Sequence, residues 1–177
     1  MENPMFDEVG INNKQYVRGD WKSIAVHDDK NIRGFFGDYR YLSNFYDCDV
    51  YCDSLRFPSS EHAYMFSKLD KKNTSEEQLK YSHDLIVYMS HAQVKKWGNK
   101  IVLRPDWEEV KYDVMASIVF DKFYRNLNLR EKLINTGDKY LEELNWWSDV
   151  IWGVDYQKGG KNWLGKILMK TRDFWNK

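Results

Sequence analysis

The sequence predicts an α+β fold that is predominantly helical, in a single domain with a few short strands. Helix-start signals and amphipathic segments recur along residues 58–173, whereas stretches with the composition of strands are short and few. A chain of 177 residues fits one domain and is long enough to bury one substantial core. No internal repeat, low-complexity tract or linker divides it.

The composition changes near residue 31, which we take as the start of the domain. Residues 1–30 hold enough apolar residues for one or two short strands, and no role is assigned to this N-terminal segment. Residues 31–177 form the predicted domain. Its first loop mixes aromatic residues with Gly, Ser and Asn, so the rings can pack inward while short polar side chains face outward. An aromatic-rich strand and turn is the alternative. Residues 49–57 predict a hairpin that turns at Asp53 and Ser54.

The helix predicted over residues 58–68 carries more polar chemistry than a core helix needs. Its serines offer an N-cap, and Glu61 lies in the first turn, where the helix dipole favours a negative charge. Helical spacing places Glu61, Tyr64 and Lys68 on one face. The rise per residue separates Glu61 and Lys68 by roughly 10 Å along the axis, a distance suited to flanking a bound sugar. The alternative is a charged helix face in solvent.

Further helix-start signals follow in order along the chain. Capping boxes over residues 74–77 and 90–93 predict two helices. Asp106 is expected to cap the longest helix, whose apolar spacing marks it as the centre of the core. Asn128 and Asn162 are expected to cap the last two helices.

Gly165 falls within the first turn of the final helix, where glycine costs about 1 kcal/mol relative to alanine. Its presence is explained if another element, or the phosphate of a ligand at the helix N-terminus, approaches the backbone closely. Gly159 and Gly160 are too short a run to be a phosphate loop.

Charge and composition exclude several classes of function. The 27 basic and 27 acidic residues balance, so no global field attracts nucleic acid or a membrane. No apolar run approaches the roughly 18 residues of a membrane span, and no secretion signal is seen.

Cys48 and Cys52 form neither a disulfide framework nor a zinc site, so we expect reduced thiols in a cytoplasmic protein. The four histidines share no ligand spacing, so neither a metal nor another cofactor is expected. No pattern indicates an oligomeric state.

Several short blocks carry a resemblance to a known family: Leu42–Phe45, Ser60–Tyr64 with Lys68, Asp106–Trp107, Val114–Met115, Lys122–Phe123, Thr136–Asp138, Asp149 with Trp152–Gly153, and Gly160, Asn162, Leu164–Lys166 and Leu168–Met169. In identity, order and spacing they resemble the YbiA-like NADAR family over about residues 31–173. Two departures stand out: Val154 and Asp155 replace a further glycine after Trp-Gly, and residues 65–67 replace a glutamine-containing approach to Lys68.

The resemblance implies a hydrolase that cleaves the N-glycosidic bond between ribose C1 and an exocyclic amine of a guanine-like ring. It implies Lys68 as a candidate nucleophile, with Glu61 and Asp149 as the carboxylates that transfer protons. A direct glycoside hydrolysis between the two carboxylates is the alternative. The substrate-binding residues that it implies are Ser43, Asn44, Phe45, Tyr64, Trp107, Trp152, Gly153, Asn162 and Gly165.

Members of the family are associated with two groups of substrates, ADP-ribose attached to guanine and the ribosylamino-pyrimidine phosphates of the riboflavin pathway. We expect removal of ADP-ribose from guanine in nucleic acid, because the domain carries no other biosynthetic module. The second hypothesis is an N-glycosidase of the riboflavin intermediates. The third is a non-catalytic module that binds ADP-ribose or NAD, although such a module could dispense with Lys68, Glu61 and Asp149. The expected partner is therefore ADP-ribosylated nucleic acid or a ribosylated small molecule.

Overall fold

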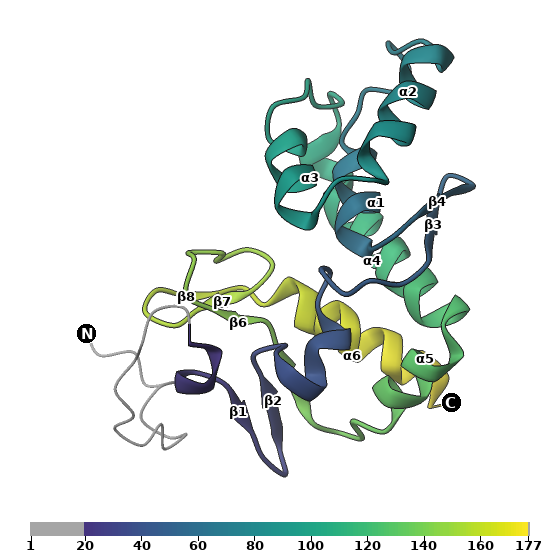
Figure 1. Ribbon diagram of the computed structural model, residues 1–177. Coiled ribbons are helices and arrows are strands. Elements are labelled where there is room, and N and C mark those ends of the chain that lie inside the picture. Colours follow the sequence, from purple (N-terminus) through teal and green to yellow (C-terminus); the bar gives the residue numbers. More distant parts are fainter. Residues whose placement is uncertain (1–19, 177) are drawn as a thin grey trace.

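The computed structural model describes residues 20–176, and helices dominate them (Figure 1). The helices are η1 (Trp21–Ser23), η2 (Gly37–Leu42), α1 (Ser60–Ser67), α2 (Glu76–Ile86), α3 (His91–Gly98), α4 (Trp107–Arg125), α5 (Leu127–Ile134) and α6 (Trp163–Trp175). The strands are β1 (Val26–His27), β2 (Asn31–Arg33), β3 (Val50–Cys52), β4 (Leu55–Phe57), β5 (Tyr140–Glu142), β6 (Leu144–Asn145), β7 (Val154–Asp155) and β8 (Gly159–Gly160). The predicted α+β class with predominant helix is confirmed.

The strands form three small sheets. β2 lies between β1, its antiparallel neighbour, and β5, which is parallel to it. β3 and β4 form the predicted hairpin, whose turn residues Asp53 and Ser54 have φ angles of 50° and 64°. β7 pairs with β6 in parallel and with β8 in antiparallel register. The chain between β6 and β7, residues 146–153, forms a loop beside the β6–β7–β8 sheet (Figure 1).

The core is organised around α4, as its apolar spacing predicts. This helix packs against α1, β3 and α6. Its inner face buries Trp107, Met115, Ile118, Val119, Lys122 and Phe123. Every residue of α1 from Ser60 to Ser67 is also buried. The helix predicted over residues 58–68 therefore lies in the interior in spite of its polar residues. Glu61 therefore lies in a dry environment and not on a charged surface.

The helix caps confirm some sequence predictions and correct others. The Ser59 side chain accepts a hydrogen bond from the His62 N–H and caps α1. The predicted capping box at Ser90 is present, whereas the box of α2 begins one residue later than predicted, at Ser75. Asp106 occupies the N-cap position of α4 without a capping hydrogen bond, because its carboxylate pairs with Arg104.

The segment before the predicted domain boundary is partly described. Strand β1 pairs with β2, and Ile24 is buried in a small cluster with Leu144 and Val154. Residues 24–27 therefore pack onto the domain. The remainder of the N-terminal segment, residues 1–19, lies outside the described residues. Within residues 20–176, no helix combines the length and the apolar character needed to cross a membrane.

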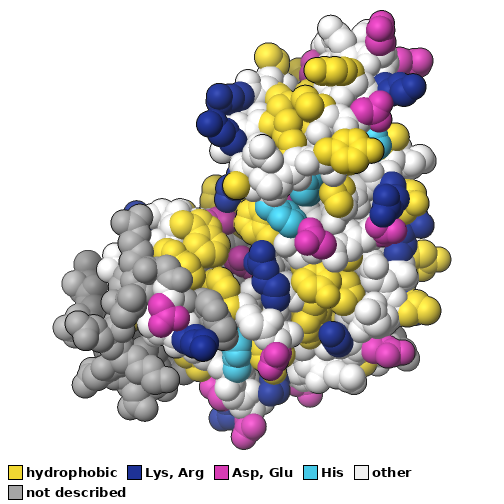
Figure 2. Space-filling view, in the orientation of Figure 1, with side chains coloured by type: hydrophobic (Ala, Val, Ile, Leu, Met, Phe, Trp, Pro, Cys, Tyr) yellow, Lys and Arg dark blue, Asp and Glu magenta, His cyan; other side chains and the backbone are white. Residues whose placement is uncertain are grey.

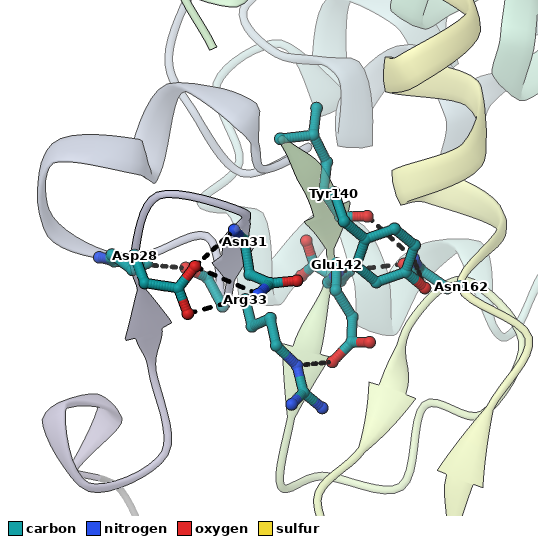
Figure 3. A network of polar contacts seen from close by, with 10 residues as sticks. Asp28, Asn31, Arg33, Tyr140, Glu142 and Asn162 are labelled. Carbon is teal, nitrogen blue, oxygen red and sulfur yellow. Dashed lines mark hydrogen bonds and ion pairs between the residues drawn. The ribbon is translucent and has the colours of Figure 1, made fainter. Parts of the chain in front are cut away.

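A buried ion pair ties the β1–β2–β5 sheet together (Figure 3). Arg33 and Glu142 face each other in the register of β2 and β5, and the Arg33 Nε donates to Glu142 Oε1 at 2.8 Å. Both side chains are almost completely closed to solvent. Since breaking a buried pair leaves an uncompensated charge, this contact fixes the strand from which the chain continues to the candidate site.

Candidate active site

A pocket of about 400 Å³ lies between α1, α3 and the start of α4 on one side and the β6–β7 loop on the other. Figure 2 shows the surface indented between the part formed by α1–α3 and the part that carries β6–β8. The lining contains most of the predicted site residues, namely Ser43, Asn44, Phe45, Glu61, Tyr64, Lys68, Trp107, Asp149 and Trp152. A larger groove of about 790 Å³ between α4 and α6 contains none of them.

Glu61 brings a buried carboxyl group to this pocket from the first turn of α1. Its side chain is almost closed to solvent, with 6% exposure, and its backbone N–H donates to the Asn44 carbonyl at 3.0 Å. Burial raises the pKa of Glu61 to about 7, and the positive charges of Lys95 and Lys68 oppose the increase. A carboxyl group that titrates near neutrality can exchange protons with a substrate at physiological pH.

Lys68 lies one helix length away, at the C-cap of α1. Its Nζ is 5.6 Å from the ring centroid of Tyr64 and 5.9 Å from that of Trp107. Burial lowers the pKa of Lys68, Glu61 counteracts this, and the positive charge of Lys95 lowers it further. A desolvated amine is more often neutral, and only the neutral amine is a nucleophile.

Asp149 is fixed in the pocket by its own loop. Its backbone is held at both ends by the Asn145 side chain, which donates to the Asp149 carbonyl and accepts from the Asp149 N–H. The Asp149 Oδ1 accepts hydrogen bonds from the N–H groups of Ile151 and Trp152, at 3.1 and 2.9 Å. These bonds orient the carboxylate and compensate its charge.

The loop after η2 contributes polar groups as expected, but its residues are not equally available. The Ser43 Oγ already accepts from the Phe45 N–H and from Arg40, and the Ser43 carbonyl accepts from the buried Nζ of Lys122 at 2.8 Å. By contrast, Asn44 Oδ1 is buried and has no hydrogen-bond partner among residues 20–176. Because unpaired buried polar atoms are costly, Asn44 Oδ1 is a candidate acceptor for a ligand hydroxyl.

The tryptophans expected to stack on a base are occupied by other rings. Tyr64 contacts both Trp107, at a centroid distance of 5.0 Å, and Trp152, at 5.4 Å. Trp152 also packs against Tyr112.

Trp147, which sequence reasoning did not select, lines the same pocket with 40% of its surface exposed. Trp147 meets Trp146 and Phe36 edge to face, with interplanar angles of 82° and 89°. Its exposed surface makes it the better candidate for stacking.

Three predicted substrate-binding residues lie outside the pocket lining, and each has a packing role instead. A Cβ on Gly153 would meet the Glu143 carbonyl at 2.3 Å, and one on Gly165 would meet the Leu141 carbonyl at 2.1 Å. Asn162 has a φ of 52°, and its amide donates to the Leu141 carbonyl and the Tyr140 hydroxyl (Figure 3). It occupies the N-cap position of α6 without a capping hydrogen bond. The close approach at Gly165 is thus made by β5.

Gly165→Ala is expected to destabilise the fold by a few kcal/mol, because the new methyl group overlaps the Leu141 carbonyl and α6 must move away from β5. Gly137→Ala is the matched control. Nothing lies within 4 Å of a Cβ at Gly137, so only its φ of 56° is unfavourable there, at a cost of about 1 kcal/mol. Urea unfolding of both variants measures the difference, and equal losses would contradict the packing role.

Sequence reasoning did not select five charged residues around the pocket. Four of them line it, namely Lys95, Glu108, Lys111 and Glu143, and Lys122 lies buried behind it. Burial raises the pKa of Glu143 to about 8 and lowers that of Lys122 to about 8. Lys122 could have been suspected, since a lysine on the apolar face of the core helix needs a buried acceptor. Lys95 and Glu143 carry no local signal, because only the tertiary fold brings α3 and the β5–β6 connection to α1.

Comparison with known proteins places this geometry in a family. Residues 34–175 match the model of the NADAR domain. The N-glycosidase YbiA of Escherichia coli is 33% identical over 137 residues, covering 77% of this chain and 81% of YbiA. The NMR structure of the E. coli protein YbiA superimposes with a TM-score of 0.69 at 30% identity, covering 86% of this chain and 88% of that one. The chain belongs to the NADAR domain family, as its sequence blocks predict.

Two further relatives match only in part, and one of them is named for riboflavin biosynthesis. The riboflavin biosynthesis protein VVA0006 of Vibrio vulnificus is 32% identical over 136 residues, which cover 77% of this chain. The N-glycosidase Npun_R5314 of Nostoc punctiforme is 44% identical over 71 residues, or 40% of this chain. The matched regions span only 35% and 45% of these two proteins. The names of the relatives therefore support an N-glycosidase and leave its substrate open.

Proposed function

We propose that this protein is an N-glycosidase that cleaves the bond between ribose C1 and an exocyclic amine of a guanine-like ring. One observation carries the proposal. Glu61 and Lys68 share a pocket in which burial raises the pKa of the acid and lowers that of the amine. Opposite shifts of this kind leave a proton acceptor and a nucleophile both usable near neutral pH. The names of the relatives, several of which are N-glycosidases, agree with this chemistry.

The proposed reaction begins with opening of the ribose to an imine at C1. The neutral Lys68 Nζ adds to C1, the exocyclic nitrogen takes a proton, and the C1–N bond breaks with its electrons going to that nitrogen. Lys68 is left as a Schiff base with the sugar. Glu61 takes a proton from the water that attacks C1 and passes it to the Lys68 nitrogen. The C1–Nζ bond then breaks, which frees the Lys68 amine and leaves the sugar as an aldehyde. The fixed charge of Asp149 stabilises the iminium.

ADP-ribosylated guanine in nucleic acid is the substrate that we propose first. Lys95 and Lys111 line the pocket and bring positive charge that suits a diphosphate, although Lys111 also donates to Glu108. Asn44 Oδ1 can accept from a ribose hydroxyl. The second candidate is a ribosylamino-pyrimidine phosphate, which the riboflavin name of the longer relative VVA0006 favours. Both contain the same type of bond, so the pocket chemistry described above serves either.

Incubation of the protein with an oligonucleotide that carries ADP-ribosyl-guanine, and separately with a ribosylamino-pyrimidine phosphate, tests the function. Mass spectrometry is expected to detect free ADP-ribose and restored guanine from the first. Cleavage of the second alone would move the protein to the riboflavin substrates. Binding without cleavage of either would contradict an enzyme and favour a module that binds ADP-ribose.

Trp147→Ala is expected to raise KM because the exposed ring no longer stacks on the base. Stacking on an aromatic side chain is worth about 1–3 kcal/mol per base, so KM should increase roughly 5- to 150-fold. Tyr88→Ala is the control, since Tyr88 is 89% exposed and lies outside the pocket. An unchanged KM in the Trp147 variant would contradict a stacking role.

A further inference from the structure

Glu143 is held in the wall of the pocket by its backbone. It lies between β5 and β6, where its N–H donates to Asn162 Oδ1 at 3.1 Å and its carbonyl accepts from the Val154 N–H at 2.9 Å. Gly153 packs so closely that a Cβ there would lie 3.1 Å from the Glu143 Cγ. The backbone of Glu143 is thus fixed, and its side chain lines the pocket together with Asp149.

One oxygen of the Glu143 carboxyl group has no partner among the described residues. This atom, Oε2, is closed to solvent and accepts no hydrogen bond from residues 20–176, whereas the residue as a whole is half-buried. A buried ionised carboxylate without a partner is strongly disfavoured, whereas the neutral acid avoids that cost and keeps a proton that it can donate. An unsatisfied acid at the wall of a pocket is a group for which a ligand can supply the acceptor.

Four charged groups act on Glu143 from the elements around it. Burial is the largest cause of its raised pKa, and the negative charges of Asp149 and Glu61 raise it further. Arg40 and Lys122 lower the pKa. However, Arg40 donates to Ser43 Oγ and the Phe45 carbonyl, and Lys122 donates to the Ser43 carbonyl. These two cations are engaged in holding the loop after η2.

We infer that Glu143 is a protonated acid that donates its proton to the leaving amine of the substrate. The inference deepens the proposed N-glycosidase function and rests on it. In this step the proton passes from the Glu143 carboxyl to the exocyclic nitrogen as the electrons of the C1–N bond move to that nitrogen. Glu143 becomes a carboxylate and regains a proton from the water consumed in the hydrolysis of the Schiff base. Glu61 is then left as the base and Asp149 as the fixed negative charge.

Glu143→Gln removes the transferable proton and keeps the shape and the hydrogen-bond donor. We expect kcat to fall on the order of 10²-fold, with Glu143→Asp retaining part of the activity and Glu109→Gln, on the exposed side of α4, unchanged. The wild-type kcat is expected to decline above about pH 8, where the acid loses its proton. The glutamine variant should lose this decline. Full activity with an unchanged alkaline limb in Glu143→Gln would overturn the inference.

A measurement that needs no turnover separates this inference from the proposed function. In protein labelled with ¹³C at glutamate carboxyls, the resonance absent from Glu143→Gln identifies Glu143, and it should report a neutral acid at pH 7. Thermal unfolding should show that both variants fold. If the resonance is that of an ionised carboxylate at pH 7, the inference fails even when the wild type cleaves its substrate. If the wild type cleaves neither substrate, the proposed function fails, and the assigned role of Glu143 fails with it.

Discussion

Lys68→Ala should abolish turnover, with a loss of kcat of at least about 10³-fold, because it removes the amine that forms the covalent intermediate. The same variant should lose trapping by borohydride, which reduces a Schiff base between Lys68 and C1 to a stable amine. In the wild type, trapping during turnover is expected to add the mass of the sugar portion to the peptide that contains residue 68. Peptide mass spectrometry after digestion locates the adduct.

Lys72→Ala is the matched control for this loss, because Lys72 is exposed and lies outside the pocket. Its kcat and trapping should equal those of the wild type. If Lys68→Ala raised KM and left kcat intact, without any trapped adduct in the wild type, the lysine would serve only to hold phosphate. Direct hydrolysis between carboxylates would then be the mechanism.

Glu61→Gln should lower kcat by about 10²- to 10⁴-fold, because it removes the group that accepts a proton from the attacking water. Since the pKa of Glu61 is raised to about 7, the wild-type kcat should increase as pH rises through 7 and the base becomes ionised. The residual activity of the glutamine variant should lack this increase. A kcat–pH series on both proteins measures the effect, and a wild-type activity that falls through pH 7 would reverse the assigned role.

The free energy of unfolding should fall as pH rises through 7, in contrast to kcat, which should increase. This provides a check that needs no substrate. The folded protein holds the Glu61 proton more tightly than the unfolded chain, whose glutamates titrate near the ordinary value of 4.5. The free energy of unfolding contributed by this group is therefore fully present below about pH 4.5 and is lost as pH rises to about 7. Glu61→Gln should remove that part of the pH dependence and leave the protein folded.

The parts of the site that the sequence predicts are those set by local spacing. Helical periodicity places Glu61 and Lys68 on one face of α1, and both line the pocket. The roles of these residues remain predictions. Trp107 and Trp152 were also located in the pocket, but periodicity does not tell which rings are covered by others. Only the packing of Tyr64 between them leaves Trp147 as the exposed surface.

Long-range pairing explains the remaining differences between prediction and structure. Asn162 and Gly165 look like a helix start suited to phosphate, yet the partner of both is the Leu141 carbonyl of β5. That neighbour cannot be read from residues near 162. Glu143 was not selected for the same reason. In the sequence it stands next to Glu142 with nothing to distinguish the two, and Glu142 forms a buried ion pair with Arg33.

The burial of α1 has a consequence for how the family can vary. Glu61 and Lys68 are joined by one continuous helix, so the distance between them is fixed by the number of residues that separates them. Inserting or deleting a single residue between them would rotate one group by about 100° relative to the other and turn it into the core. In the β6–β7 loop, which carries Asp149 and Trp147, no helix fixes the spacing of the residues in this way. Diversity in substrate should therefore accumulate in that loop, while the length of α1 stays constant.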